Sequence, residues 1–207
     1  MFILFLLVHL IPWLGFLATE QDVQDGTNLK DCLQLLTYMI KRFVDKKPQI
    51  HETAYISDDA IVIGDVEISG NASIWFGSIL RGDVNFIRIG AGTNIQDGTI
   101  IHVSSKTHST ILENDITVGH RVMLHGCYVE SNCLIGIGSI ILDGARIGKN
   151  SLVAAGSLIT PGTQIPPGSM VMGSPAKVKR PLTDEEIAGI EQSARKYVEL
   201  SAIYKKM

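Results

Sequence analysis

The chain has 207 residues, a formal net charge of −3 and 45% apolar residues. This composition suits one well-buried domain and gives no basic footprint for binding nucleic acid. The three cysteines, Cys32, Cys127 and Cys133, are odd in number and show no zinc-ribbon or CxxC spacing. The pattern argues against a disulfide framework and favours a reducing, cytoplasmic compartment.

An apolar leader opens the chain, because residues 2–18 include no Lys, Arg, Asp or Glu. A secretory signal would carry a basic n-region, which is absent. A membrane span needs about 17–25 apolar residues, and this run is short and contains Pro12 and Gly15. A third interpretation is that the native chain starts at Met39. We expect residues 1–38 to have no folding role, with membrane contact or export only if residues 2–18 belong to the native protein.

Aliphatic residues recur every six positions from Ile50 onward. They form three series: Ile50, Ile56, Val62, Ile68, Ile74, Leu80, Phe86; Ile89, Ile95, Ile101; and Val129, Ile135, Ile141, Ile147, Val153, Ile159, Ile165, Val171. Four positions after most of them lies a small residue, such as Ala60 or Ser139. One hexad cannot bury its own apolar side, but stacked coils of three hexads bury a continuous column. The repeat predicts an all-β fold, a parallel β-helix over residues 39–181.

The period changes after Pro181. Thr183 and Glu186 have the spacing of a capping box, and apolar or small residues follow at spacings of three and four. This pattern predicts a C-terminal helix within residues 182–207. It should start near Asp184 and lie along one face of the prism.

Three of the six histidines lie where the hexad repeat breaks. His102 directly follows Ile101, whereas His120 and His125 precede the third series. Between them, residues 103–117 abandon the period, so we expect an excursion loop. Histidine is the commonest zinc ligand, and a catalytic zinc typically has three protein ligands. The cluster therefore predicts a metal site. The other histidines are expected to be solvated, structural or incidental: His9, His51 and His108.

The spacing of His120 and His125, five positions, suits no metal site built from a single element. A helix favours residues four apart, and a strand places only alternate residues on one face. In a prism, residues five apart straddle a corner, so the two imidazoles should project from different places. We expect a neighbouring subunit to supply the missing ligand, in a closed cyclic oligomer that repeats the site at each interface.

Five segments together resemble the gamma-class carbonic anhydrase family, in its shorter branch: "LRGDVNFIRIG", "TNIQDGTIIH", "VGHRVMLHGC", "LIGIGSIILDGA" and "VMGSPAKVKR". The resemblance covers residues 39–207 and favours Met39 as the native start. It implies a left-handed β-helix and a homotrimer with one metal ion per interface, zinc with iron or cobalt as alternatives. The implied ligands are His102 and His125 of one chain and His120 of its neighbour.

The resemblance also assigns roles to four further residues. Arg81 and Asp83 match a charged pair that helps to hold the trimer together. Gln96 matches a glutamine that hydrogen-bonds the metal-bound solvent, and Asp97 would orient a neighbouring group. The implied reaction is the reversible hydration of carbon dioxide to bicarbonate by a metal-bound hydroxide. It uses a water pKa lowered to about 7, a magnitude known for carbonic anhydrases in general.

The chain departs from the best-studied form of that family, because "VNFIRIG" after Asp83 contains no glutamate where that form has an acidic loop for proton transfer. Weak or conditional hydration is therefore expected. Two other functions stay in view: a non-catalytic trimer that binds metal or serves in assembly, and a CoA-dependent acyltransferase, which needs one interface histidine as general base. The "GSPAKVKR" segment resembles the end of the acyltransferase repeats as well, but three histidines favour a metal.

Overall fold

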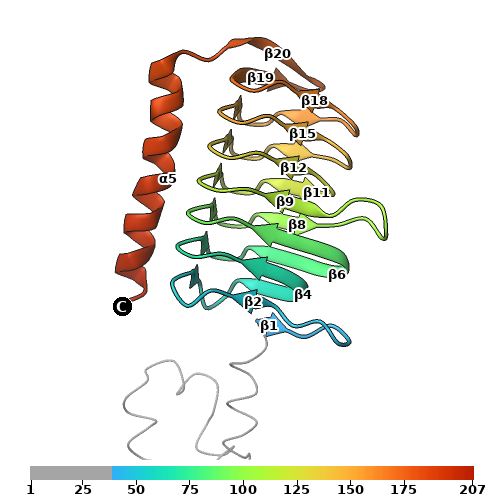
Figure 1. Ribbon diagram of the computed structural model, residues 1–207, viewed down its shortest axis with the longest axis vertical. Coiled ribbons are helices and arrows are strands. Elements are labelled where there is room, and N and C mark those ends of the chain that lie inside the picture. Colours follow the sequence, from blue (N-terminus) through green and yellow to red (C-terminus); the bar gives the residue numbers. More distant parts are fainter. Residues whose placement is uncertain (1–38) are drawn as a thin grey trace, which may run out of the picture. The chain divides into compact units, whose positions relative to one another are not determined.

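The computed structural model describes residues 39–207, and the predictions for residues 1–38, the apolar stretch 2–18 included, lie outside the described residues. In the described part, short strands stack coil upon coil (Figure 1). The strands, in chain order, are β1 (Ile40–Lys41), β2 (Gln49–Ile50), β3 (Tyr55–Ile56), β4 (Ile61–Ile68), β5 (Ser73–Ile74), β6 (Ile79–Ile89), β7 (Asn94–Ile95), β8 (Ile100–His102), β9 (Thr110–Leu112), β10 (Thr117–Val118), β11 (Met123–His125), β12 (Tyr128–Val129), β13 (Leu134–Ile135), β14 (Ile140–Ile141), β15 (Arg146–Ile147), β16 (Leu152–Val153), β17 (Leu158–Ile159), β18 (Gln164–Ile165), β19 (Ser169–Gly173) and β20 (Ala176–Pro181).

The strands form a 12-stranded and an 8-stranded sheet. Strand β6 pairs with β8 near its start and with β9 near its end, so the larger sheet bends at β6 and covers two faces of the prism. The smaller sheet, from β3 to β20, forms the third face. Pairing is parallel throughout the named strands of residues 39–207, except between β19 and β20. The predicted parallel β-helix of hexapeptide repeats is therefore confirmed.

The hexad pattern accounts for the interior. Leu80, Ile101, Leu124 and Ile141 stand in register on successive coils and are fully buried. The small residues fit the corners, where Thr99 is also buried and its hydroxyl donates to the Gly119 carbonyl of the next coil at 3.1 Å. Each coil thus buries its aliphatic column against its neighbours, which a single hexad cannot do.

Two details of the predicted repeat are wrong, one in its register and one in the length of its loop. Phe86 is only half-buried, under the Arg88 guanidinium, and Ile87 occupies the core instead, because the bend in β6 shifts the register. The loop expected over residues 103–117 is shorter than that, because β9 lies within this range, β10 begins at its last residue, and both strands pair in the stack. The chain leaves the prism over residues 104–109, here called the excursion loop, which projects beside β8 and β9 in Figure 1.

Helix α5 (Asp184–Tyr204) begins where the sequence predicts. The Thr183 side chain accepts a hydrogen bond from the Glu186 N–H, and the Glu186 carboxylate accepts one from the Thr183 N–H at 3.0 Å. The helix lies along the 8-stranded sheet (Figure 1), contacts β3, β5, β7 and β10, and buries Ile190 and Ala194. It covers one face of the prism and leaves the larger sheet's outer faces, where His102 and His125 lie, uncovered by the helix.

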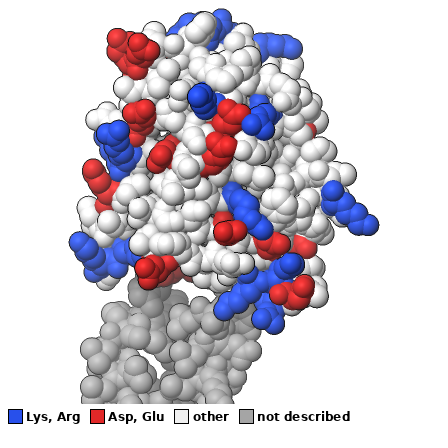
Figure 2. All heavy atoms as spheres, in the orientation of Figure 1, with Lys and Arg blue, Asp and Glu red and all other residues white. Residues whose placement is uncertain are grey.

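Charges on the face shown in Figure 2 are mixed in sign, with basic and acidic side chains next to each other among uncharged residues. Such interspersed charges produce no extended field of one sign on that face. Within residues 39–207, no helix combines the length and the apolarity that a membrane crossing requires.

Candidate metal centre

Two of the three predicted ligands lie side by side on neighbouring coils. Strand β11 pairs with β8 so that His125 is in register with His102. The Nδ1 atom of His102 lies 3.1 Å from the Nε2 atom of His125, and the ring centroids are 5.0 Å apart. Each histidine follows a fully buried residue, Ile101 or Leu124, so strand alternation turns both imidazoles outward.

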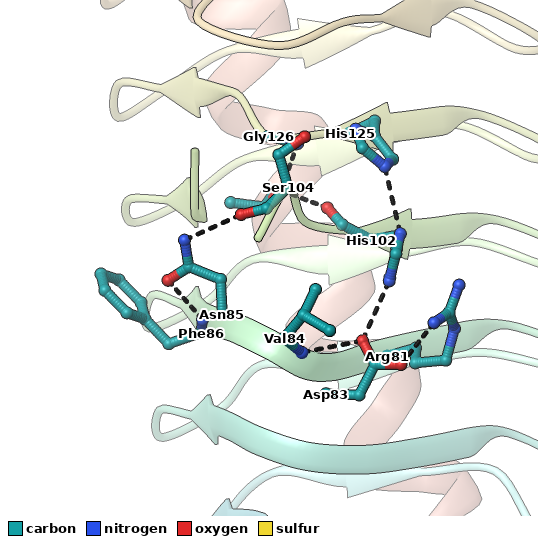
Figure 3. Close-up of polar contacts among 10 residues, drawn as sticks. Arg81, Asp83, Val84, Asn85, Phe86, His102, Ser104, His125 and Gly126 are labelled. Carbon is teal, nitrogen blue, oxygen red and sulfur yellow. Dashed lines mark hydrogen bonds and ion pairs between the residues drawn. The ribbon is translucent and has the colours of Figure 1, made fainter. Parts of the chain in front are cut away.

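Each imidazole of this pair is held by a carboxylate at its other nitrogen. The Nε2 atom of His102 lies 3.0 Å from an Asp83 oxygen, and the Nδ1 atom of His125 lies 2.5 Å from an Asp143 oxygen. Figure 3 shows Asp83, His102 and His125 in one line that crosses three coils. We call these four residues, Asp83, His102, His125 and Asp143, the histidine column.

Both carboxylates of the histidine column are shifted toward the ionised form. Partial burial by itself would raise the pKa of Asp83, but hydrogen bonds from His102 and Arg81 outweigh it and lower that pKa below its ordinary value. Partial burial would also raise the pKa of Asp143. Hydrogen bonds from Ser104 and His125 outweigh this effect, so the pKa of Asp143 is lowered as well. Both carboxylates are therefore hydrogen-bond acceptors at neutral pH.

The two facing nitrogens of this pair can each present a lone pair. Because a carboxylate only accepts, the carboxylate-bound nitrogens of His102 and His125 carry N–H protons, and in the tautomers without a second ring proton the two facing nitrogens are both acceptors. In those tautomers the two nitrogens, 3.1 Å apart, do not hydrogen-bond each other, and a cation between them satisfies both. Nitrogen ligands at 2.0–2.1 Å on tetrahedral zinc are about 3.3–3.4 Å apart. The pair therefore fits two positions of a metal ion.

The third predicted ligand, His120, belongs to a different place. Its Nδ1 atom lies 2.9 Å from an Asp97 oxygen, and both side chains are nearly half exposed. Because β10 pairs with β7, with Val118 opposite Ile95, His120 lies one coil beyond Asp97 at the same corner of the prism. Within residues 39–207 of one chain, no three His, Cys, Asp or Glu side chains gather around one metal position.

The other predicted site residues divide between these two places. Arg81 forms an ion pair with Asp83 inside the chain and so adjoins the histidine column. Gln96 precedes Asp97 at the corner, where its amide is buried and donates to the Asn94 side chain at 3.1 Å. One chain thus carries two separate groups of predicted site residues, which we call half-sites after the prediction that subunits share the site. The first holds the histidine column and Arg81, and the second holds Gln96, Asp97 and His120.

Of the remaining histidines, His51 is exposed and hydrogen-bonds Thr53, and His108 is exposed in the excursion loop. His9 lies outside the described residues.

Asp143 is the residue of the histidine column that sequence reasoning missed. The three predicted ligands lie at the break in the repeat, whereas Asp143 lies in a regular stretch, directly after β14 and Leu142. The signal that could have found it is the coil itself. Asp143 follows His125 by 18 residues, which is three hexads and therefore one full turn of the prism.

Comparisons with known proteins agree with this fold and site. A family model described as "Bacterial transferase hexapeptide (six repeats)" matches residues 126–161, which places the chain in the hexapeptide-repeat class. The "Carbonic anhydrase" of Geobacillus kaustophilus is 48% identical, over 82% of this chain and 92% of its own length. "Gamma carbonic anhydrase 2, mitochondrial" of Arabidopsis thaliana is 47% identical over 77% of this chain, and the matched region spans 59% of that relative.

A solved structure is also similar. A Bacillus cereus protein, provisionally named an acetyltransferase, superposes with a TM-score of 0.80 and 45% identity, covering 81% of this chain and 97% of that one. The curated relatives settle the family: this chain belongs to the gamma carbonic anhydrase family.

Proposed function

We propose that the protein hydrates carbon dioxide reversibly to bicarbonate at a metal site shared between the subunits of a homotrimer. The observation that carries the proposal is the pair of facing imidazole nitrogens on His102 and His125, 3.1 Å apart, with each ring fixed by a carboxylate at its other nitrogen. Relatives named carbonic anhydrases support the same reaction. We take zinc as the metal, with iron or cobalt as alternatives, because imidazole ligands suit all three.

The chain's own residues would hold and orient that metal. His102 and His125 supply two nitrogens, and Asp83 and Asp143 fix the ring orientations and raise the basicity of the ligands. The ion would lower the pKa of a coordinated water and so supply hydroxide for attack on carbon dioxide. Arg81 forms an ion pair with Asp83 and so balances the charge of the carboxylate that holds His102.

A second copy of the chain would complete the site through His120. Asp97 binds the Nδ1 atom of His120, which leaves the Nε2 atom to act as a ligand, as in the histidine column. Gln96, next to Asp97, would hydrogen-bond the reacting solvent once its amide turns away from Asn94. The same corner meets the same column at each interface of a closed trimer, so three equivalent sites result.

The outer surface beside the histidine column favours such an assembly. One apolar residue per coil points outward in register along β6, β8, β11, β14 and β17. This apolar stripe consists of Ile79, Ile100, Met123, Ile140 and Leu158. Ile100 and Ile140 are 37% and 41% exposed. Contiguous exposed apolar residues mark protein interfaces, and on β11 the stripe residue Met123 lies between His120 and His125 in the sequence.

Measurements of metal binding, acetyl-CoA binding and carbon dioxide hydration distinguish two other functions from this one. An acyltransferase, the activity given in the name of the Bacillus cereus structure, would bind acetyl-CoA without stoichiometric metal. A non-catalytic metal-binding or assembly trimer would bind metal without hydrating carbon dioxide at any pH. The carboxylate-held histidine pair favours metal over acyl transfer, because a general base needs one imidazole only.

The cysteine pattern supports a cytoplasmic location, with export through residues 2–18 as the alternative.

The experiment that tests the proposal combines metal analysis with a stopped-flow hydration assay. The metal-loaded protein should contain one metal ion per chain and accelerate hydration. His120→Ala should lose at least about tenfold in metal affinity and most of the activity, because one of three ligands is gone. His51→Ala, which changes an exposed histidine far along the chain, should behave as the wild type. Equal hydration rates for His120→Ala and wild type would contradict the mechanism.

A further inference from the structure

We infer that Asp143 is a positioning residue that sets the tautomer of His125 and connects this ligand to the excursion loop. The inference deepens the proposed function and rests on its metal site. Its evidence, however, is a hydrogen-bond arrangement of the metal-free chain, which an experiment without metal can test separately.

The first step is that the two carboxylate oxygens of Asp143 bind different residues. Oδ1 lies 2.5 Å from the Nδ1 atom of His125. Oδ2 accepts a hydrogen bond from the Ser104 hydroxyl at 2.6 Å. With each oxygen bound to a different neighbour, the carboxylate plane cannot rotate without breaking both contacts. The orientation of His125 is therefore fixed through Asp143 by a residue of the excursion loop.

The second step is the room that the backbone leaves for this contact. Gly126, directly after His125, has a φ of +57°, and a Cβ atom there would lie 2.3 Å from the Asp143 Oδ1 atom. Only a residue without a side chain permits the carboxylate to approach so closely. The approach is thus built into the turn that follows β11.

The third step concerns the excursion loop, whose base is fixed on both sides of the histidine column. At its start, the Ser104 carbonyl accepts from the Asn85 side chain at 3.1 Å. Directly after its end, the Thr110 hydroxyl donates to the His102 carbonyl at 2.7 Å and accepts from the Gly126 N–H at 2.9 Å. Figure 3 shows Asn85, Ser104, His102 and Gly126 in this arrangement. Ser104 therefore lies at an anchored point and can hold Asp143 firmly.

The consequence for the metal site follows from the tautomer. While Asp143 accepts from Nδ1–H, the Nε2 atom of His125 presents a lone pair toward His102. Without that acceptor, the proton is free to move to Nε2, from which it can donate to the His102 Nδ1 atom 3.1 Å away. The two histidines would then satisfy each other and would no longer face a metal ion with two lone pairs.

The test compares Asp143→Ala and Asp143→Asn with the wild type and with Asp58→Ala, which changes an exposed carboxylate outside both half-sites. Long-range ¹H–¹⁵N correlation spectra of the metal-free proteins report the tautomer of His125. We expect the Nδ1–H form in wild type and Asp58→Ala, and a substantial Nε2–H population in Asp143→Ala. Chelator competition should show zinc affinity reduced about 10–100-fold in Asp143→Ala, with an intermediate loss in Asp143→Asn, which keeps an acceptor oxygen.

An unchanged His125 tautomer in a folded Asp143→Ala protein would overturn the inference, and so would unchanged zinc affinity. If Asp143→Ala does not fold, the isosteric Asp143→Asn decides by the same two measurements. A wild-type chain that binds no zinc would refute the proposed function, and the tautomer measurement on metal-free protein would still decide the role of Asp143.

Discussion

Gly126 shows how one residue can serve both the backbone and the site. Its positive φ closes the turn after β11, and its missing Cβ atom leaves space for Asp143. Gly156, five hexads further on and at another corner of the prism, has a similar φ of +67°, but a Cβ atom there would have no atom within 4 Å. The two glycines therefore separate the effect of backbone strain from the effect of the collision.

We expect Gly126→Ala to lower both stability and metal affinity. A non-glycine residue at this φ costs about 1–2 kcal/mol, and the collision with Asp143 adds to that cost and displaces the carboxylate from His125. Gly156→Ala should show the strain alone, with unchanged metal affinity. Urea unfolding and chelator competition on both variants make the comparison, and equal metal affinities in Gly126→Ala and Gly156→Ala would count against the proposed role of this space.

At the scale of elements, the start of α5 joins the helix to the last strand. Hydrogen bonds from Arg180, and then from the Thr183 backbone, lower the pKa of Glu186 from its ordinary 4.5 to about 2. A carboxylate with a lowered folded-state pKa contributes stability above its unfolded value, and this contribution is lost as the pH falls through the folded value. The cap should therefore weaken between about pH 4.5 and pH 2.

Glu186→Gln tests this contribution. Its removal should flatten the pH dependence of helix stability in that window, because Gln does not ionise. Circular dichroism at 222 nm during urea unfolding at pH 6, 4 and 3 gives the measurement. Glu191→Gln, on the same helix, serves as the control, and the account fails if Glu191→Gln flattens the profile as much as Glu186→Gln.

The sequence predicted the secondary-structure elements more completely than the residues of the candidate site. The hexad repeat predicted the β-helix because each aliphatic position, such as Ile101 or Leu124, makes the same buried contact on every coil. The bend at Phe86 and the strand β9 inside residues 103–117 escaped prediction, since an inserted corner shifts the register without changing composition. Asp143 escaped for another reason: its partner lies a full coil away, and the pair emerges only when the 18-residue period of the coil is applied to each histidine.

At the scale of the whole molecule, the central proposal is that neither half-site functions alone. The apolar stripe lies on the face with the histidine column, away from α5, and is the part of the surface that a second copy would cover. A charge in the middle of such a surface opposes association, because burying an unpaired charge is costly.

We expect the double variant Ile100→Asp and Ile140→Asp to be a folded monomer with little metal affinity. Both positions point outward, so the buried column of the coil stays intact. Ile203→Asp, which changes an exposed residue of α5, should leave the trimer unchanged. Sedimentation velocity gives the masses, and a trimeric double variant would show that the stripe is not the interface.

Complementation between two inactive variants tests the shared site most directly. His102→Ala keeps a functional His120, and His120→Ala keeps functional His102 and His125. Each variant alone should be inactive, but co-refolded in equal amounts they should regain about one quarter of the wild-type hydration rate, the share of interfaces that combine the two intact halves in a cyclic trimer. A mixture as inactive as its components would contradict a site shared between subunits.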